Sequence, residues 1–316
     1  MNIATDYFSE IVGQSDVKRK LSFYIDGYQK TSMIPHFMFV AERGFGKTLM
    51  ATKIAKHLIV DGKPKRCREI NCSTIKSVAK FVEQVMLPFI QDNECTILFD
   101  EASELPKDLT MSLLTMLNPN DNNRNTFVFG DMSFDIDFKK HSFLFATTEP
   151  QKIFHALMSR CQRIDFDAYK PIELMTIVKK NVDKNNSKIK FSDAVSEIIP
   201  TVLRHNPRCA QMMASDVINY CAQFGIKLFD IKEWEDMKKQ LGIKPMGLNA
   251  TEIRVLKILE NNTKGLRLVD IASRIGLTSS AIQRDVELFL MRNELICMDG
   301  GRKITTKGRE YLENLV

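Results

Sequence analysis

Several features that define other protein classes are missing from this 316-residue sequence. No stretch approaches the roughly 20 consecutive apolar residues that a membrane-spanning helix requires, so no membrane segment is predicted. The first residues, MNIATDYFSEIV, lack a basic segment followed by an apolar core, which argues against a secretory signal peptide. We therefore expect a cytoplasmic protein.

The cysteines form no C-x-x-C pair, and the charge has no strong excess of either sign. Cys67 and Cys72 are near one another in the chain, and the other five cysteines are scattered. Without a ligand pair a zinc site is not expected, and buried, reduced thiols are the favoured interpretation. The net charge of +6 permits an anionic partner such as nucleic acid but does not require one.

The hydrophobic pattern predicts an α/β protein that begins with a parallel sheet. The chain is too long for one ordinary core. Apolar runs at 37–40, 95–100 and 141–148 predict buried strands, and the segments between them have helical periodicity. Strands that alternate with helices are typical of a parallel sheet with crossover helices. From 171 to about 224 the periodicity is helical only, and the glycines and proline of 241–249 indicate a linker.

One glycine is missing from an otherwise complete phosphate-binding sequence, VAERGFGKT. The pattern G-x-x-x-x-G-K-[ST] begins with glycine, and Ala41 stands in that place. Lys47 would reach the β- and γ-phosphates, and the hydroxyl of Thr48 would bind Mg²⁺. Because Ala41 keeps its backbone N–H group, we expect an active site for ATP or ADP. The residues predicted to surround the phosphates are Arg43, Gly44, Phe45, Gly46, Lys47, Thr48 and Leu49.

Polar side chains follow the second and third predicted strands. Asp100 and Glu101 come directly after a buried apolar run, where carboxylates are costly unless they serve a cation or water. We expect Asp100 to hold Mg²⁺ with Thr48, and Glu101 to orient and deprotonate the attacking water. Thr148, at the end of the third strand, would contact the γ-phosphate or that water.

This order of motifs resembles the AAA+ ATPases. IVGQSDVKRKL (11–21) is similar to the adenine-side segment of that family, which implies that Ile11, Val12 and Gly13 lie near the base. ALMSRCQRIDF (156–166) resembles the segment that carries the arginine finger, so Arg160 would reach the site of a neighbouring subunit. RHNPRCAQMM (204–213) resembles the sensor-2 helix, which implies that Arg208 lies over the phosphates.

Residues 126–138 have the alternation of a β-hairpin around Gly130 and Asp131. Their position, followed by FLFATT, resembles the RuvB family of Holliday-junction branch-migration motors, in which such a hairpin docks the junction-binding partner RuvA. The resemblance implies a RuvA-like partner for an apolar hairpin tip. The tip residues assigned to this partner are Phe129, Met132 and Phe134, and the flanking acids Asp131, Asp135 and Asp137 argue against DNA as the ligand.

The C-terminal segment, 248–316, predicts three helices followed by two short strands, which is a winged helix. It resembles the C-terminal domain of the RuvB family over its whole length. Its 11 basic and 9 acidic residues do not by themselves demand nucleic acid. The residues assigned to DNA are Ser279, Ser280, Gln283, Arg284, Arg302 and Lys303.

Together these features predict an AAA+ large domain (1–166), a helical lid domain (167–245) and a winged-helix DNA-binding domain (246–316). The expected function is a hexameric, ATP-driven translocase on double-stranded or branched DNA. A clamp-loader-like subunit is the first alternative, because SRCQR is closer to the clamp-loader form of the finger segment. An initiator or adaptor that uses ATP only as a switch is the second.

Overall fold

The computed structural model describes residues 6–185, 188–262 and 264–315. It contains two compact units, which are described separately. Unit 1 comprises Met1–Ile177 with Asn206–Cys209, and unit 2 comprises Val178–His205 with Ala210–Val316. Within the described ranges, no helix has both the length and the apolar character to cross a membrane.

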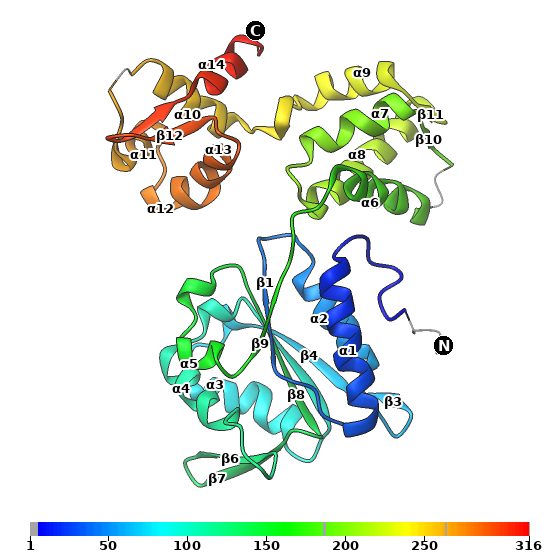
Figure 1. Ribbon diagram of the computed structural model, residues 1–316, viewed down its shortest axis with the longest axis vertical. Helices are drawn as coiled ribbons and strands as arrows, with labels where there is room; N and C mark the ends of the chain where they lie inside the picture. The colour runs from blue at the N-terminus through cyan, green and yellow to red at the C-terminus, as the bar shows by residue number, and fades with distance from the viewer. Residues whose placement is uncertain (1–5, 186–187, 263, 316) are drawn as a thin grey trace. The chain divides into compact units, whose positions relative to one another are not determined.

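Unit 1 is built on a five-stranded parallel sheet in the order β4-β5-β8-β1-β9 (Figure 1). The three central strands are β5 (Cys95–Asp100), β8 (His141–Thr147) and β1 (Phe37–Val40), as the sequence predicts. The edge strands β4 (Arg66–Asn71) and β9 (Gln162–Asp165) were not predicted. All four residues of β1 and all seven of β8 are buried, which explains their continuous apolar runs.

Helices cover both faces of this sheet (Figure 1). One face packs against α1 and α2 through residues such as Leu21, Ile25 and Ile54. The other packs against α3, α4 and α5 through residues such as Phe81, Leu113 and Leu157. The elements are α1 (Ser15–Thr31), α2 (Lys47–His57), η1 (Cys72–Thr74), α3 (Val78–Phe81), the π-helix η2 (Val82–Ile90), η3 (Ala102–Glu104), α4 (Lys107–Met116), η4 (Pro150–Lys152) and α5 (His155–Met158), with a short ribbon of β2 (Ile59–Val60) and β3 (Lys63–Pro64).

The predicted hairpin is present as β6 (Arg124–Phe129) and β7 (Met132–Asp137). Its two faces differ. Phe127 and Phe134 form a cross-strand pair, are each 4% exposed and belong to the core of unit 1. The assignment of Phe134 to an exposed tip is therefore wrong, because its strand alternation turns it inward. The outward residues are Met132, 39% exposed, and Val128, 65% exposed, which the sequence analysis did not select.

Two buried titratable side chains fix the base of this hairpin to the sheet. The ammonium group of Lys65 donates to the carbonyl of Lys139 at 2.5 Å, and burial lowers the pKa of Lys65 to about 8. His141 accepts from the backbone N–H of Asp137 through Nδ1 at 3.1 Å, so Nε2 donates to the Asn93 carbonyl at 2.9 Å. Burial also lowers the pKa of His141, which favours this neutral form.

Unit 2 begins within α6 (Pro171–Lys184) and contains a helical part and a winged-helix part. The helical part has α7 (Asp193–Ile198), η5 (Ile199–Val202), α8 (Pro207–Phe224) and α9 (Ile231–Leu241). It also has a small parallel pair, β10 (Lys190–Phe191) and β11 (Leu228–Phe229), where the sequence predicts no strand. The turn η6 (Pro245–Gly247) follows α9, within the predicted linker.

The winged-helix part has the predicted elements and one more. The described elements are α10 (Ala250–Glu260), α11 (Leu268–Ile275), α12 (Ser279–Ile282) continuing through η7 (Gln283–Glu287) into α13 (Leu288–Arg292), β12 (Ile296–Met298), β13 (Arg302–Ile304) and α14 (Thr306–Glu313). Thr278 caps α12 by accepting from the backbone N–H of Ala281. The wing strands β12 and β13 pair antiparallel. The additional helix is α14.

An ion pair joins the two parts of unit 2, and we call it the helix joint (Arg204, Glu252 and Phe289). Glu252 is fully buried and accepts from Arg204 at 2.7 and 3.3 Å. The guanidinium of Arg204 lies 3.6 Å from the ring centroid of Phe289. Nearby, Gly247 has φ +70°, and a Cβ there would lie 2.2 Å from the carbonyl oxygen of Val202. The helical part and the winged helix are therefore packed directly against one another.

The cysteines are only partly as predicted. All seven are free thiols. Three of them, Cys72, Cys95 and Cys221, are buried, but Cys67 and Cys297 are exposed. Cys67 escapes burial because it lies on the polar edge strand β4, which buries only Ile70.

Candidate nucleotide-binding site

The phosphate loop lies where the sequence places it, between β1 and α2. Gly44 and Gly46 adopt φ values of +88° and +89°, which side chains rarely tolerate. A Cβ on Gly44 would also lie 2.6 Å from Oδ1 of Asn206 and 2.9 Å from Cβ of Arg208. Both glycines are therefore required by backbone conformation, and Gly44 is also required by its neighbours.

Ala41, in contrast, does not adopt a positive φ. Its backbone N–H donates to the Thr147 carbonyl at 3.4 Å, and its own carbonyl accepts from Lys47. Alanine therefore stands in the place of the first glycine without backbone strain. The departure from the phosphate-loop pattern does not disrupt the loop.

Lys47 is held inside the loop by backbone carbonyls. It is only 7% exposed, and its ammonium donates to the carbonyls of Ala41 at 2.8 Å and Glu42 at 2.9 Å. Burial lowers the pKa of Lys47 to about 8; the nearby Asp100 carboxylate opposes this shift, and the Arg208 guanidinium adds to it. A phosphate anion beside Lys47 would stabilise its charged form, so the site is suited to bind one.

Two hard oxygen donors converge where Mg²⁺ is expected. The Thr48 hydroxyl donates to Oδ2 of Asp100 at 3.2 Å, and Oδ1 of Asp100 accepts from the backbone N–H of Glu101 at 3.1 Å. Oxygen ligands of this kind suit Mg²⁺, which usually keeps several waters and completes its shell with substrate phosphates. Throughout the described ranges, no group of three or more His, Cys, Asp or Glu residues offers an alternative metal site. The donor set therefore fits the ion.

Glu101 lies at the turn that follows β5, in a left-handed conformation with φ +54°. This conformation is unusual for a residue other than glycine and is often associated with functional sites. At the neighbouring strand end, Thr147 is fully buried, and its hydroxyl accepts from the backbone N–H of Glu149. Thr148 is exposed at the same edge of the sheet. Its side chain is therefore accessible for the predicted contact with phosphate or water.

The predicted base-side residues meet a part of the chain that the sequence analysis missed. Gly13 has φ +69°, and a Cβ there would lie 2.9 Å from Oε1 of Glu173 and 3.2 Å from the ring of Tyr169. The Tyr169 hydroxyl donates to the carbonyl of Phe45 in the phosphate loop at 3.5 Å. Tyr169 thus links the base-side segment with the phosphate loop. Of the other predicted residues, Ile11 is in the core, Val12 is half-buried, and Arg43 and Leu49 are exposed.

Asn206 is a second residue that the sequence analysis missed. Its amide donates to the carbonyl of Arg43 at 2.9 Å, and its Oδ1 accepts from the backbone N–H of Arg208 at 2.9 Å. It therefore caps the start of α8 and attaches that helix end to the phosphate loop. Arg208 is exposed and lies near enough to Lys47 to lower its pKa, in agreement with a position beside the phosphates. The sequence does contain a signal for this cap, because an asparagine directly before a proline, here Asn206 before Pro207, is typical of a helix start.

Arg160 is engaged within its own chain. Its guanidinium donates to the Ala156 carbonyl at 2.9 Å and to Oδ1 of Asn118 at 3.0 Å. Nε of Arg160 is buried and has no hydrogen-bond partner among the described residues. None of these contacts joins Arg160 to its own phosphate loop, so its role in a neighbouring subunit stays a prediction.

The cations assigned to DNA are paired with acids. Arg302 makes a two-pronged ion pair with Glu287, at 2.9 and 3.2 Å, and both side chains are largely buried. Arg302 is thus a structural residue of the wing rather than a free cation, which differs from the prediction. Lys303 pairs with Asp299 at 2.7 Å and Arg284 with Asp285 at 2.8 Å, both at the surface. The remaining assigned residues, Ser280 and Gln283, are exposed, and Ser279 is half-buried at the start of α12.

Comparison with known proteins finds a family match for each of two segments of the chain. Residues 37–171 match the ATPase family associated with various cellular activities (AAA), and residues 245–313 match the RuvB C-terminal winged helix domain. The Holliday junction branch migration complex subunit RuvB of Mycoplasmopsis pulmonis is 27% identical over 98% of this chain and 96% of that protein. The chain is a RuvB-like AAA+ protein. Its AAA domain makes it an ATP-hydrolysing enzyme.

The RuvB-like protein is similar to further RuvB subunits over nearly its whole length. That of Ureaplasma urealyticum is 24% identical, with 98% of this chain and 95% of the relative covered. The structure of the Thermotoga maritima RuvB Holliday junction branch migration motor has a TM-score of 0.80 at 21% identity, covering 98% of each chain. The fold predicted from the sequence, an AAA+ sheet domain with a C-terminal winged helix, is confirmed.

Proposed function

We propose that the RuvB-like protein is an ATP-driven motor that moves double-stranded DNA and drives branch migration at Holliday junctions. The observation that carries the proposal is the complete hydrolytic set at the carboxyl edge of the sheet. Lys47 is buried in the phosphate loop, Thr48 and Asp100 are hydrogen-bonded to each other, and Glu101 lies at the adjoining turn. The RuvB subunits that resemble this chain bear the name of the branch migration complex.

The proposed chemistry assigns one task to each side chain. Lys47 exchanges its carbonyl partners for the β- and γ-phosphates. Thr48 and Asp100 would hold Mg²⁺, which would neutralise charge on the phosphates. Glu101 orients the attacking water and accepts its proton, and Thr148 fixes the water or the γ-phosphate. Arg208 faces the same phosphates from the start of α8.

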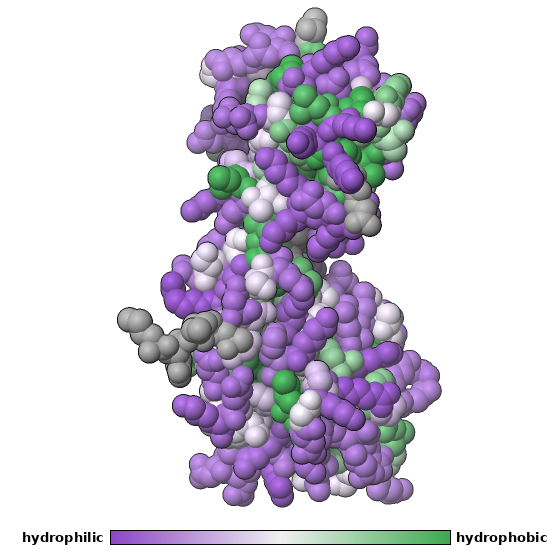
Figure 2. All heavy atoms as spheres, turned by 90° about the vertical axis from the view of Figure 1, so that its right-hand side faces the viewer, coloured by the Kyte–Doolittle hydropathy of each residue, from purple (hydrophilic) through white to green (hydrophobic). Residues whose placement is uncertain are grey.

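We propose that six copies assemble into a ring and that Arg160 acts in the site of a neighbouring copy. The hydrogen bond from the Arg160 guanidinium to Asn118 is exposed, so Asn118 would be exchanged for the neighbouring site on assembly. Exposed apolar side chains on unit 2 support self-association, and Figure 2 shows hydrophobic residues gathered on one face of this unit. Those of the helical part include Phe224, Leu228 and Leu241, which are 49%, 54% and 53% exposed.

We also propose that the β6–β7 hairpin binds a RuvA-like partner through its outward face. Val128 and Met132 are exposed on strands whose inner face is fixed in the core, so the surface is apolar but rigid. Rigid, exposed apolar side chains are suited to a protein interface.

The proposed organisation keeps the three predicted domains at 1–166, 167–245 and 246–316. A clamp-loader-like subunit is less well supported, because the C-terminal segment matches a RuvB winged helix. An ATP-switched initiator or adaptor would use the same site for single turnovers. Continuous ATP turnover stimulated by duplex DNA would separate a motor from a switch.

The test combines ATP turnover with conversion of a synthetic four-way junction. Glu101→Gln should leave nucleotide affinity intact and abolish both activities, because the base is lost while the Mg²⁺ ligands remain. Glu104→Gln, three residues away on an exposed turn, is the matched control and should retain both. Wild-type turnover in Glu101→Gln would refute the assignment of the base. Wild-type ATPase without any junction conversion, with or without a RuvA-like protein, would refute the motor.

A further inference from the structure

The segment from the end of α9 to α10 is rich in positive charge. Residues 238–257 contain five basic residues and one acidic residue, whereas the whole chain has a net charge of +6. The single acid is Glu252, which is fully buried and paired with Arg204 in the helix joint. In the remainder of the winged helix, 258–316, nine basic residues face eight acidic ones. The segment from the end of α9 to α10 is therefore more basic than the rest of the winged helix.

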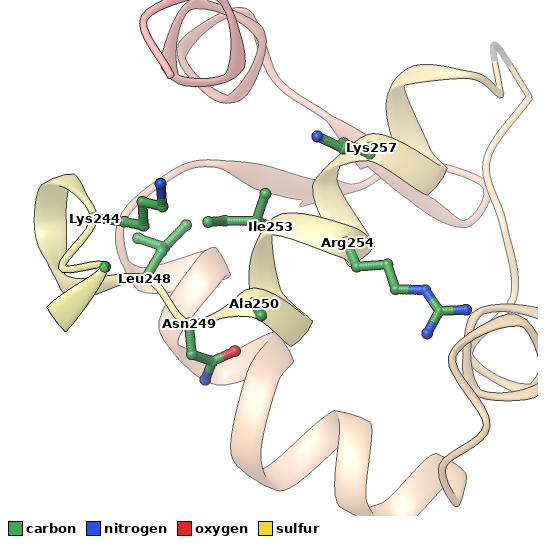
Figure 3. Close-up of a pocket in the computed structure, with 8 residues that line it drawn as sticks. Lys244, Leu248, Asn249, Ala250, Ile253, Arg254 and Lys257 are labelled. Atoms are coloured by element: carbon green, nitrogen blue, oxygen red, sulfur yellow. The ribbon is translucent and has the colours of Figure 1, made fainter. Parts of the chain in front are cut away.

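This segment surrounds a hollow of about 390 Å³. Its lining residues are Gly242, Lys244, Leu248, Asn249, Ala250, Ile253, Arg254 and Lys257. In Figure 3 the side chains of Leu248 and Ile253 form an apolar floor, and those of Lys244 and Lys257 extend on the same side of α10. Arg254 points the other way and donates to the Arg274 carbonyl at 2.9 Å. The hollow is thus apolar at its base and basic at its rim, and no carboxylate lines it.

The rim cations are available, unlike those of the wing. Over the ranges that the structure describes, Lys244, Arg254 and Lys257 make no ion pair with a carboxylate. Arg302, in contrast, is held by the buried Glu287, and removing it from that partner would leave an unpaired buried charge. A polyanion would therefore meet less competition at the hollow than at the wing.

We propose that this basic hollow binds the sugar–phosphate backbone of double-stranded DNA, with Lys244 and Lys257 as the principal phosphate contacts. The inference rests on the proposed function and assigns the DNA contact to a different surface of unit 2. The N-terminal amides of α10 are not the source of binding, because Asn249 and Glu252 already cap each other at 2.8 and 2.9 Å. Charge comes from the side chains, and the floor of Leu248 and Ile253 accommodates deoxyribose.

Backbone contacts of this kind hold DNA without reading its sequence. Each phosphate neutralised by a lysine releases condensed cations, so the logarithm of the affinity falls with the logarithm of the salt concentration by about 0.9 per contact. If Lys244 and Lys257 contact phosphates, removing them should make the salt dependence of DNA binding shallower. If the two lysines have only a structural role, the salt dependence should not change.

The test measures binding of the full-length protein to unrelated duplex oligonucleotides by fluorescence anisotropy over a range of salt concentrations. The double variant Lys244→Ala/Lys257→Ala should lower the salt slope by up to about two units and weaken binding at least about tenfold at 0.1 M salt. The control Lys179→Ala/Lys180→Ala removes the same charge from exposed positions of α6 in the same unit and should change neither. ATP turnover without DNA and thermal melting should be the same in all three proteins.

Three outcomes would contradict the proposal that the basic hollow binds DNA. If wild type binds duplexes and the hollow variant keeps both its slope and its affinity, the basic hollow is not the contact and the proposed function is unaffected. If the control variant loses binding equally, the effect is one of overall charge, which also overturns the site. If wild type binds no duplex at low salt in the presence of a non-hydrolysed ATP analogue, both the proposed function and this inference fail.

Discussion

The helix joint gives the sharpest stability prediction, because one substitution leaves a fully buried carboxylate without its partner. In Arg204→Met the side-chain volume is largely kept, and Glu252 loses both hydrogen bonds from the guanidinium. Breaking a buried ion pair in this way costs about 3–5 kcal/mol. Since the Arg204 side chain is 24% exposed, water can partly replace it, and we expect a loss of about 2–3 kcal/mol in the free energy of unfolding.

Urea unfolding followed by tryptophan fluorescence measures this loss directly. Trp234 is the only tryptophan of the chain, is 1% exposed and lies on α9, so its emission reports on unit 2. The control Arg267→Met removes an ion pair with Asp270 at the surface of the same unit and should cost less than about 1 kcal/mol.

A double-mutant cycle isolates the pair from the helix cap. Glu252→Gln preserves the capping box, because glutamine can accept the same backbone N–H group, but removes the charge. The double variant Arg204→Met/Glu252→Gln should therefore recover part of the stability that Arg204→Met loses. If Arg204→Met unfolds at the same urea concentration as Arg267→Met, or if the cycle shows no coupling, the joint does not hold unit 2 together.

Three further predictions concern unit 1. Because burial holds the pKa of Lys47 near 8 and a bound phosphate favours its charged form, ATP affinity measured by titration should fall as the pH rises from 7 to 9; an unchanged affinity would contradict this. Met132→Asp should shift thermal melting by less than the equivalent of about 0.5 kcal/mol, whereas Phe134→Asp should unfold the hairpin; equal melting would contradict the two-faced hairpin. Mixtures of Arg160→Ala and Glu101→Gln subunits, each inactive alone, should regain ATP turnover, and doping wild type with Arg160→Ala should lower activity more steeply than the mutant fraction. A proportional fall would contradict action in a neighbouring subunit.

The central sheet was predictable because its strands are buried on both faces. Every residue of Phe37–Val40 and of His141–Thr147 is buried, and each strand contains an uninterrupted apolar run of four residues, 37–40 and 143–146. The edge strand Arg66–Asn71 buries only Ile70 and leaves no such run. Its place in the sheet depends on pairing with β5, which is a tertiary fact that local pattern does not contain.

The same limit applies to the candidate site. Lys47 and Thr48 were predictable because a contiguous motif carries them. Tyr169 and Asn206 reach the phosphate loop from segments more than 120 residues away in the chain, and no local spacing indicates it. Arg302 was assigned to DNA from its position on the wing, but its partner Glu287 is fifteen residues earlier and is brought to it only by folding.

The turn at 204–208 has a thermodynamic consequence. Arg204 and His205 are consecutive left-handed residues, with φ +55° and +54°, a conformation that costs energy for residues other than glycine. At one end of this stretch Arg204 pairs with Glu252 of the winged helix. At the other end Asn206 donates to the Arg43 carbonyl of the phosphate loop, and Arg208 follows it. If nucleotide at the loop alters the affinity of unit 2 for a polyanion by some factor, that polyanion must alter nucleotide affinity by the same factor. DNA would then be an effector of ATP binding as well as the polymer that the proposed motor moves. Titration of nucleotide with and without DNA, and titration of DNA with and without nucleotide, would give the same coupling free energy.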